Sequence, residues 1–329
     1  MLVENVPQSH IKEVKNPYYH DAAKVKIDTV FSYPIDNQET EFKKFRAGEL
    51  HSTSTLPNSQ IKWAQENLKD AFTAGSTYST YYMAFNLTHE PWKSSPKLRA
   101  ALSLVIDREV IAEKVVGGGE LPAWSFTPPG NVGGYEPPRL PWTKQTQAER
   151  DAMAKKLLAE AGYGPGAKPL PEIEVLHYTS DNARKVNVAV AAMWKQKLGI
   201  QTRLNNQEFR VVASIGNEKA YKDVLYYGWI GDYPDANSFL QLFRSDVEQQ
   251  NLSGFKSAEF DRLLDEANRQ TDPAKRAELL GKAETVALES DSIITLHHNT
   301  RRRLISPKLK GWVPNPTDFN LSQFLEVTP

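Results

Sequence analysis

The spacing of apolar positions in the first third of the chain predicts both strands and helices. A strand is expected over residues 27–34, and residues 81–87 predict a buried strand because they are rich in β-favouring aromatic residues. Ser95 and Pro96 suit the N-cap and the first position of a helix, where a missing N–H has no consequence. This helical stretch is expected to end at the three glycines 117–119.

The remainder of the chain predicts an α/β fold. Thr146 and Glu149 form a capping-box pattern for a helix. A strand near residues 172–175, a helix that ends at Gly199 and a strand at 200–204 then make a βαβ unit, in which parallel strands are expected. The spacing of apolar residues also predicts a strand over 223–229, helices that begin at Ser257 and Asp272, and a strand over 293–296.

Composition excludes several classes of function. The chain of 329 residues carries 40 basic and 40 acidic residues, and the net charge of zero argues against a general nucleic-acid binder. It contains no cysteine, which rules out disulfides, zinc–thiolate sites and thiol catalysis. No apolar run approaches the roughly 20 residues that span a bilayer.

Catalytic and metal-binding motifs are absent from the sequence. It contains no HExxH, no GxSxG, no P-loop and no GxGxxG between a strand and a helix. The adjacent pair His297 and His298 is poorly placed for joint metal ligation, because neighbours in a strand point to opposite faces. We therefore expect a protein that is not an enzyme and that holds no cofactor or metal. The basic residues 301–303 predict a solvated strand or a hinge.

Residues 226–237 are the most informative segment. A strand is expected to end near Trp229, and a loop rich in Gly, Asp and Pro follows it. Ligands of α/β sheets bind beyond the carboxyl ends of the strands. Gly228 and Gly231 would let a ligand backbone approach closely, and Trp229 and Tyr233 offer flat apolar walls with a polar tip.

Asp232 in this loop is a short anion suited to a cationic ligand group. An alternative is that Asp232 closes an Asx-type turn before Pro234 while Trp229 belongs to the core. A second alternative pairs Asp232 with Asp235 as the acid and base of a peptide hydrolase. This pairing needs one carboxyl with a raised pKa, and a loop flanked by Gly and Pro gives no indication of such burial.

Several stretches together resemble the bacterial extracellular solute-binding protein family 5, in its oligopeptide- and murein-peptide-binding subgroup. They include SSPKLRAALSLVIDREVI from Ser94, KKLLAEAGYG from Lys155, GWIGDYPDANSFL from Gly228 and SAEFDRLLDEA from Ser257. The resemblance implies a two-lobe, periplasmic-binding-protein type II-like fold. Family members are longer at the amino end, so a partial lobe I (1–126 and 299–329) and a complete lobe II (127–298) are expected.

The same resemblance implies a function. The chain is expected to act in the periplasm as a monomeric receptor that captures short peptides and delivers them to the permease subunits of an ABC transporter in the inner membrane. Nucleic acid is not an expected partner. Alternatives are a receptor for murein peptides or for another solute of this family, and a fragment with little affinity for any ligand.

Residue roles carried over from the family centre on Asp232, which is expected to hold the α-ammonium group of the peptide. Main-chain groups of Gly228 and Ile230 would pair with the peptide backbone as an added strand does. Tyr226 stands where the oligopeptide-binding prototype has an arginine for ligand carboxylates, and Arg184 is a candidate substitute. The other expected ligand-binding residues are Phe209, Trp229, Tyr233, Asn237, Asn299 and Phe126.

Overall fold

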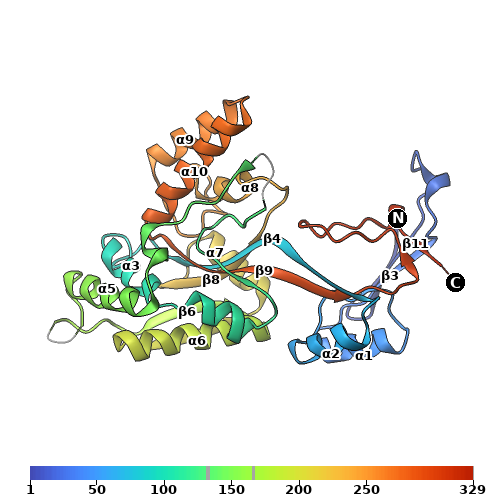
Figure 1. The fold of residues 1–329 in the computed structure, drawn as a ribbon, viewed down its shortest axis with the longest axis horizontal. Coiled ribbons are helices and arrows are strands. Elements are labelled where there is room, and N and C mark those ends of the chain that lie inside the picture. Colours follow the sequence, from blue (N-terminus) through green and yellow to red (C-terminus); the bar gives the residue numbers. More distant parts are fainter. Residues whose placement is uncertain (131–133, 165–166, 329) are drawn as a thin grey trace. The chain divides into compact units, whose positions relative to one another are not determined.

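The computed structural model divides the chain into two compact units (Figure 1). Unit 1 comprises Met1–Thr77 and Thr300–Pro329, and unit 2 comprises Tyr78–Asn299. Two strands, β4 (Phe72–Phe85) and β9 (Ile293–Leu304), contain residues of both units. The structure describes residues 1–130, 134–164 and 167–328.

Unit 1 is a small assembly of strands and two helices. An antiparallel sheet joins β1 (Leu2–Val6), β2 (His10–Val14) and β3 (Thr29–Ser32), and β10 (Leu309–Lys310) pairs with β11 (Glu326–Val327). The helices are α1 (Gln38–Arg46) and α2 (Ile61–Asn67). Phe42, Ala64 and Leu304 belong to a buried cluster that packs these helices against the end of β9.

Unit 2 is built on a mixed sheet with the strand order β5-β9-β4-β8-β6-β7. Its remaining strands are β5 (Leu121–Pro122), β6 (Ile173–Tyr178), β7 (Thr202–Gln207) and β8 (Val224–Ile230). The strands β6 and β7 are parallel and flank the helix α6 (Asp181–Leu198), so the predicted βαβ unit is confirmed. In contrast, β4 runs antiparallel to β8.

Helices cover the sheet of unit 2 on both faces (Figure 1). They are α3 (Pro96–Leu104), α4 (Arg108–Val110), α5 (Gln147–Glu160), α6, α7 (Phe209–Asn217), α8 (Asn237–Leu240), α9 (Ala258–Arg269) and α10 (Pro273–Glu289). One buried cluster contains Val224 together with side chains of α3, α5 and α6. The other contains Leu225 with side chains of α8, α9 and α10, as the alternation of side chains along a strand requires.

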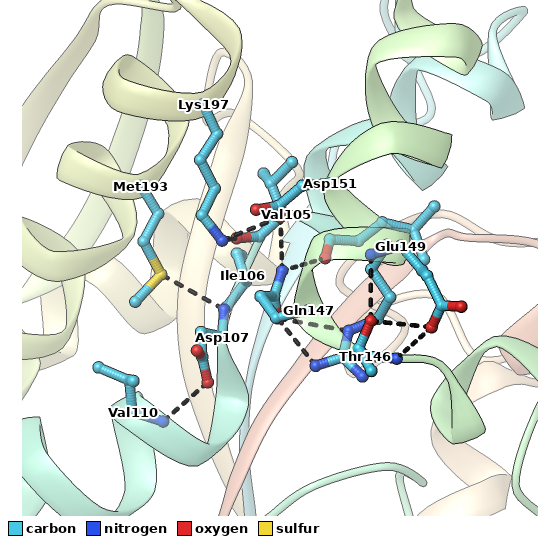
Figure 2. A network of polar contacts seen from close by, with 12 residues as sticks. Val105, Ile106, Asp107, Val110, Thr146, Gln147, Glu149, Asp151, Met193 and Lys197 are labelled. Carbon is cyan, nitrogen blue, oxygen red and sulfur yellow. Dashed lines mark hydrogen bonds and ion pairs between the residues drawn. The ribbon is translucent and has the colours of Figure 1, made fainter.

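The helix expected to run from Pro96 to the glycines 117–119 is interrupted, so this prediction is corrected. After α3, the side chain of Asp107 accepts the N–H of Val110 (2.9 Å) and caps a second helical segment. Figure 2 shows the interruption, where Lys197 of α6 donates to the carbonyl oxygen of Val105 (2.9 Å). The second segment ends at Gly117 in the left-handed conformation, as expected.

One boundary of unit 2 lies far from the predicted lobe boundary, and the other lies one residue from it. Unit 2 begins at Tyr78 rather than Thr127, and it ends at Asn299, one residue beyond the predicted end of lobe II. Residues between 78 and 126 pack within unit 2: the indole of Trp194 in α6, for example, donates to the carbonyl oxygen of Leu102 (2.9 Å). The division into two ligand-closing lobes stays a prediction.

His298 is a buried, neutral imidazole in the sheet of unit 2. The hydroxyl of Thr80 donates its single hydrogen to the carbonyl oxygen of Phe126 (2.7 Å) and lies 2.8 Å from His298 Nδ1. The imidazole Nδ1 must therefore carry the hydrogen and donate to the hydroxyl. Burial lowers the pKa of His298 to about 3, and the charges of His297 and Arg139 act in the same direction.

We predict that His298 contributes to unfolding of the chain in acid. Its pKa of about 3 in the folded protein lies below the value of roughly 6.5 in an unfolded chain, so stability present above pH 6.5 is lost as pH falls. The variant His298→Asn keeps a donor for Thr80 and cannot be protonated in this range. Between pH 7 and 4.5, chemical denaturation should therefore show about 2–3 kcal/mol less loss of stability in the variant than in the unaltered chain. Equal losses in the two proteins would contradict this role.

Candidate functional site

Strand β8 pairs with different neighbours along its two edges. On one edge its ladder with β4 runs from the pair Phe85–Val224 to the pair Ser79–Ile230. On the other edge, the ladder with β6 that the structure describes consists of Val175–Val224 and Leu176–Leu225. The end of β8, from Tyr226 onward, therefore has one edge paired with β4 and one edge beyond the described ladder.

The phase of the β4 ladder decides which main-chain groups lie on that second edge. The N–H of Gly231 donates to the carbonyl oxygen of Tyr78 (2.7 Å), so Gly231 is directed toward β4. In an antiparallel ladder hydrogen-bonded and non-hydrogen-bonded residues alternate. Trp229 is consequently directed toward β4, whereas the N–H and C=O groups of Gly228 and Ile230 point away from it. Such an edge is a template for an added strand.

The two glycines of this segment are required by the packing of the protein itself. A Cβ atom on Gly228 would lie 2.7 Å from Cε1 of Tyr81. A Cβ atom on Gly231 would lie 2.6 Å from Tyr78 Cδ1 and 2.7 Å from Phe239 Cε2. Side chains of β4 and α8 therefore occupy the space beside both glycines. The expectation that these glycines let a ligand backbone approach closely stays a prediction.

Asp232 and Asp235 have different environments although they lie in one loop. The Asp232 side chain is exposed, and its carboxylate has no hydrogen-bond or ion-pair partner in the described part of the chain. Asp235 accepts the N–H of Asn237 (2.8 Å) and forms a two-bond ion pair with Arg276 (2.7 and 2.9 Å). The Asx-type turn considered for Asp232 is thus made by Asp235.

Electrostatics distinguish these two carboxyl groups further. Burial raises the pKa of Asp235, but the hydrogen bonds from Arg276 and Asn237 and the charge of Arg276 outweigh it, so the pKa lies below its usual value. Asp235 is therefore ionised, and the positive charge of Arg276 compensates its negative charge. The carboxylate of Asp232 is exposed to solvent and has no such partner in the described residues.

Aromatic side chains border the open end of β8. Phe209, the first residue of α7, is 50% exposed; its ring stacks on Tyr227 (6.0 Å between centroids) and meets the edge of Tyr178 (5.5 Å). Trp229 is half-buried, and its indole donates to the carbonyl oxygen of Ser238 (2.8 Å). Phe209 thus supplies an apolar surface, and Trp229 also holds the loop that follows it.

The remaining predicted site residues come from several segments of the chain. Tyr226 and Phe126 are each 1% exposed and belong to buried core clusters, and their contact with a ligand stays a prediction. The exposed Arg184 lies near Asp181 of its own helix (3.9 Å), and Asn299 is half-buried at the end of unit 2. The contact of Arg184 does not involve the loop around Asp232.

Two further predicted residues do join the loop. Asn237 donates from its side-chain amide to the hydroxyl of Tyr233 (2.9 Å), and Tyr233 is 40% exposed. Sequence reasoning missed Tyr178, Ser238 and Arg276. The aromatic residue at the end of a predicted strand gave some indication of Tyr178. No feature of the neighbouring sequence indicates Arg276, because its partner Asp235 lies 41 residues away.

Neither a metal centre nor a membrane-spanning helix is present among the residues that the structure describes. No group of three or more His, Cys, Asp or Glu side chains there is arranged to hold a metal ion. Among the helices of these same residues, none has both the length and the apolar character needed to cross a bilayer.

Comparison with known families identifies the class of protein. A family model described as "Bacterial extracellular solute-binding proteins, family 5 Middle" matches residues 1–251. The chain belongs to this family. Members of the family are solute-binding receptors rather than enzymes.

Similar proteins within the family are periplasmic binding proteins. The periplasmic murein peptide-binding protein MppA of Escherichia coli is 34% identical over 328 residues, which cover 99% of this chain and 60% of the relative. The periplasmic oligopeptide-binding protein OppA of Salmonella typhimurium is 34% identical over 301 residues, covering 91% of this chain and 54% of the relative. The chain thus spans a little more than half the length of these relatives.

Solved structures agree with this assignment and confirm the expected fold class. The structure of the E. coli murein tripeptide binding protein matches with a TM-score of 0.91, covering 99% of this chain and 63% of that one. Haemophilus influenzae OppA in complex with the peptide RPPGFSPFR matches with a TM-score of 0.90 at 30% identity, with coverage of 99% and 63%. The mixed α/β structure therefore has the fold of this family over its length.

We predict that two glycines of unit 2 respond oppositely to substitution by alanine. Gly231→Ala places a methyl group against Tyr78 and Phe239 and should destabilise the chain by about 1–3 kcal/mol. A methyl group on Gly281 of α10 would meet no atom within 4 Å, so Gly281→Ala should stabilise the chain by about 0.5–1 kcal/mol. Urea denaturation of both variants measures the difference. If Gly231→Ala leaves the free energy of unfolding unchanged, the loop accommodates the methyl group and the prediction is wrong.

Proposed function

We propose that this chain is the ligand-anchoring part of a periplasmic receptor that captures short peptides and passes them to the membrane permease of an ABC importer. The observation that carries the proposal is the unpaired carboxylate of Asp232 directly after the open edge formed by Gly228 and Ile230. The relatives named above, which bind oligopeptides or murein peptides, support it. The two-lobe division implied by the family is part of the same proposal.

The chemistry of this arrangement suits features that every peptide shares. An α-ammonium group can donate to the Asp232 carboxylate, and a hydrogen bond between charged groups contributes about 1.5–3 kcal/mol. The peptide main chain can pair with the outward N–H and C=O groups of Gly228 and Ile230 as an added strand. Because neither contact depends on a side chain of the peptide, the receptor would accept peptides of many sequences.

A hydrolase built on Asp232 and Asp235 is not supported. An acid and base pair requires one carboxyl whose pKa is raised so that it holds a proton near neutral pH. Arg276 holds the pKa of Asp235 below its usual value instead. This chain is therefore proposed to bind its ligand without chemical change.

The role of Asp232 can be tested by calorimetry with a tripeptide that has a free amino terminus. Asp232→Asn keeps the shape of the side chain and removes its charge, so affinity should fall more than tenfold. Glu259→Gln is a matched control, because Glu259 is likewise exposed and has no partner in the described residues. Acetylation of the peptide amino group should reproduce the loss in the unaltered chain. Equal affinities of Asp232→Asn and the control would contradict the proposal.

The role of the main-chain edge calls for a variant without a donor at position 230. Ile230→Pro removes an N–H that points away from β4, so the ladder with β4 keeps its bonds. We expect at least a tenfold loss of affinity for the tripeptide, while Ile230→Ala, which keeps the N–H, should lose much less. Circular dichroism verifies that both variants are folded. If the proline and alanine variants bind alike, peptide pairing does not use this edge.

A further inference from the structure

Arg276 of helix α10 is joined to the loop that carries Asp232. It lies in the first turn of the helix, and its guanidinium group donates two hydrogen bonds to Asp235, at 2.7 and 2.9 Å. Both side chains are about three-quarters buried, with exposures of 28% and 24%. A two-bond pair of this kind fixes orientation as well as distance. The start of α10 and residue 235 are thereby held in one geometry.

A series of hydrogen bonds continues from Asp235 to Asp232. Asp235 accepts the N–H of Asn237, the first residue of α8. In the same turn, the fully buried Ser238 accepts the N–H of Asp232 on its hydroxyl oxygen (2.8 Å). The Ser238 carbonyl oxygen in turn accepts the indole N–H of Trp229. The main chain of residue 232 is therefore positioned by a turn whose geometry depends on the ion pair.

The ion pair also decides how much negative charge the loop presents. Without Arg276, two carboxylates three residues apart would share one loop with no cation bound to either. With Arg276 bound, Asp235 is neutralised and Asp232 alone offers an unpaired carboxylate. Burial of an uncompensated carboxylate at Asp235 would be unfavourable, so the turn would rearrange to expose it.

We propose that Arg276 is a positioning residue for peptide recognition: through Asp235 and the turn at Ser238 it orders the loop so that Asp232 is directed at the α-ammonium group. This inference rests on the proposed function of Asp232. Arg276 itself touches no ligand in this proposal, so its effect must be measured on the order of the loop and on selectivity for the charged amino terminus.

The first measurement is amide hydrogen exchange in the ligand-free chain, compared between Arg276→Met and Arg244→Met. Arg244 is a matched control, because it is 23% exposed and pairs with Asp246 (2.9 Å) and Asp265 (2.6 Å) away from this loop. Exchange of residues 231–237 should quicken at least tenfold in Arg276→Met and stay unchanged in Arg244→Met. Equal exchange of this segment in the two variants would overturn the inference.

The second measurement compares a tripeptide with a free amino terminus and its N-acetylated form. The ratio of their dissociation constants should fall at least fivefold in Arg276→Met and stay constant in Arg244→Met, even if both variants lose similar thermal stability. In the double variant Asp235→Asn with Arg276→Met, the ratio should be no lower than in Arg276→Met, since the two residues act as one unit. If Arg276→Met leaves the ratio of the two dissociation constants unchanged, Arg276 has only a structural role and the inference is wrong.

Failure of the proposed function gives a different pattern. If the unaltered chain binds the free and the acetylated peptide equally, Asp232 does not bind the amino terminus, and Arg276 has no positioning role in recognition, whatever the exchange of the loop shows. If the unaltered chain discriminates strongly and Arg276→Met discriminates equally well, the function stands and only the inference about Arg276 falls.

Discussion

The candidate site depends on one constraint, the phase of the ladder between β4 and β8. The bond from the Gly231 N–H to Tyr78 sets this phase, and it turns the main-chain groups of Gly228 and Ile230 away from β4. A slip of one residue would turn these groups inward and reverse every side chain of the strand. The main-chain edge that we propose for peptide pairing therefore follows from the register of the sheet more than from any single side chain.

The glycines explain how the register is maintained. Gly228 faces Tyr81 in a non-hydrogen-bonded pair, where opposite side chains come closest, and the tyrosine ring occupies the place of a side chain at 228. Gly231 is fitted in the same way between Tyr78 and Phe239. Any other alignment would place a bulky β8 residue opposite these rings. The fit of Tyr78 and Tyr81 of β4 to the glycines at positions 228 and 231 therefore favours this one register.

Local signals made much of the fold predictable, and long-range contacts account for the rest. The caps at Thr146, Ser257 and Asp272 start helices where expected, because a cap involves neighbouring residues only. The interruption after α3 was missed although Asp107 is a local cap for the second segment. The contact that Lys197 makes there with the Val105 carbonyl oxygen comes from far along the chain and has no local signal. For the site, the resemblance indicated Asp232, but the burial of Tyr226 depends on a sheet and helices assembled from distant segments.

Asp232 and Asp235 show why residue type alone cannot assign a role. They are the same residue, three positions apart in one loop, and either could be drawn as the anion that meets a ligand. Arg276 binds one of them and leaves the other unpaired. A receptor that accepts many peptides must bind what all peptides share, namely a charged amino terminus and a regular main chain. One unpaired carboxylate beside an open strand edge meets both requirements, whereas two unpaired carboxylates would leave the position of the amino terminus undefined.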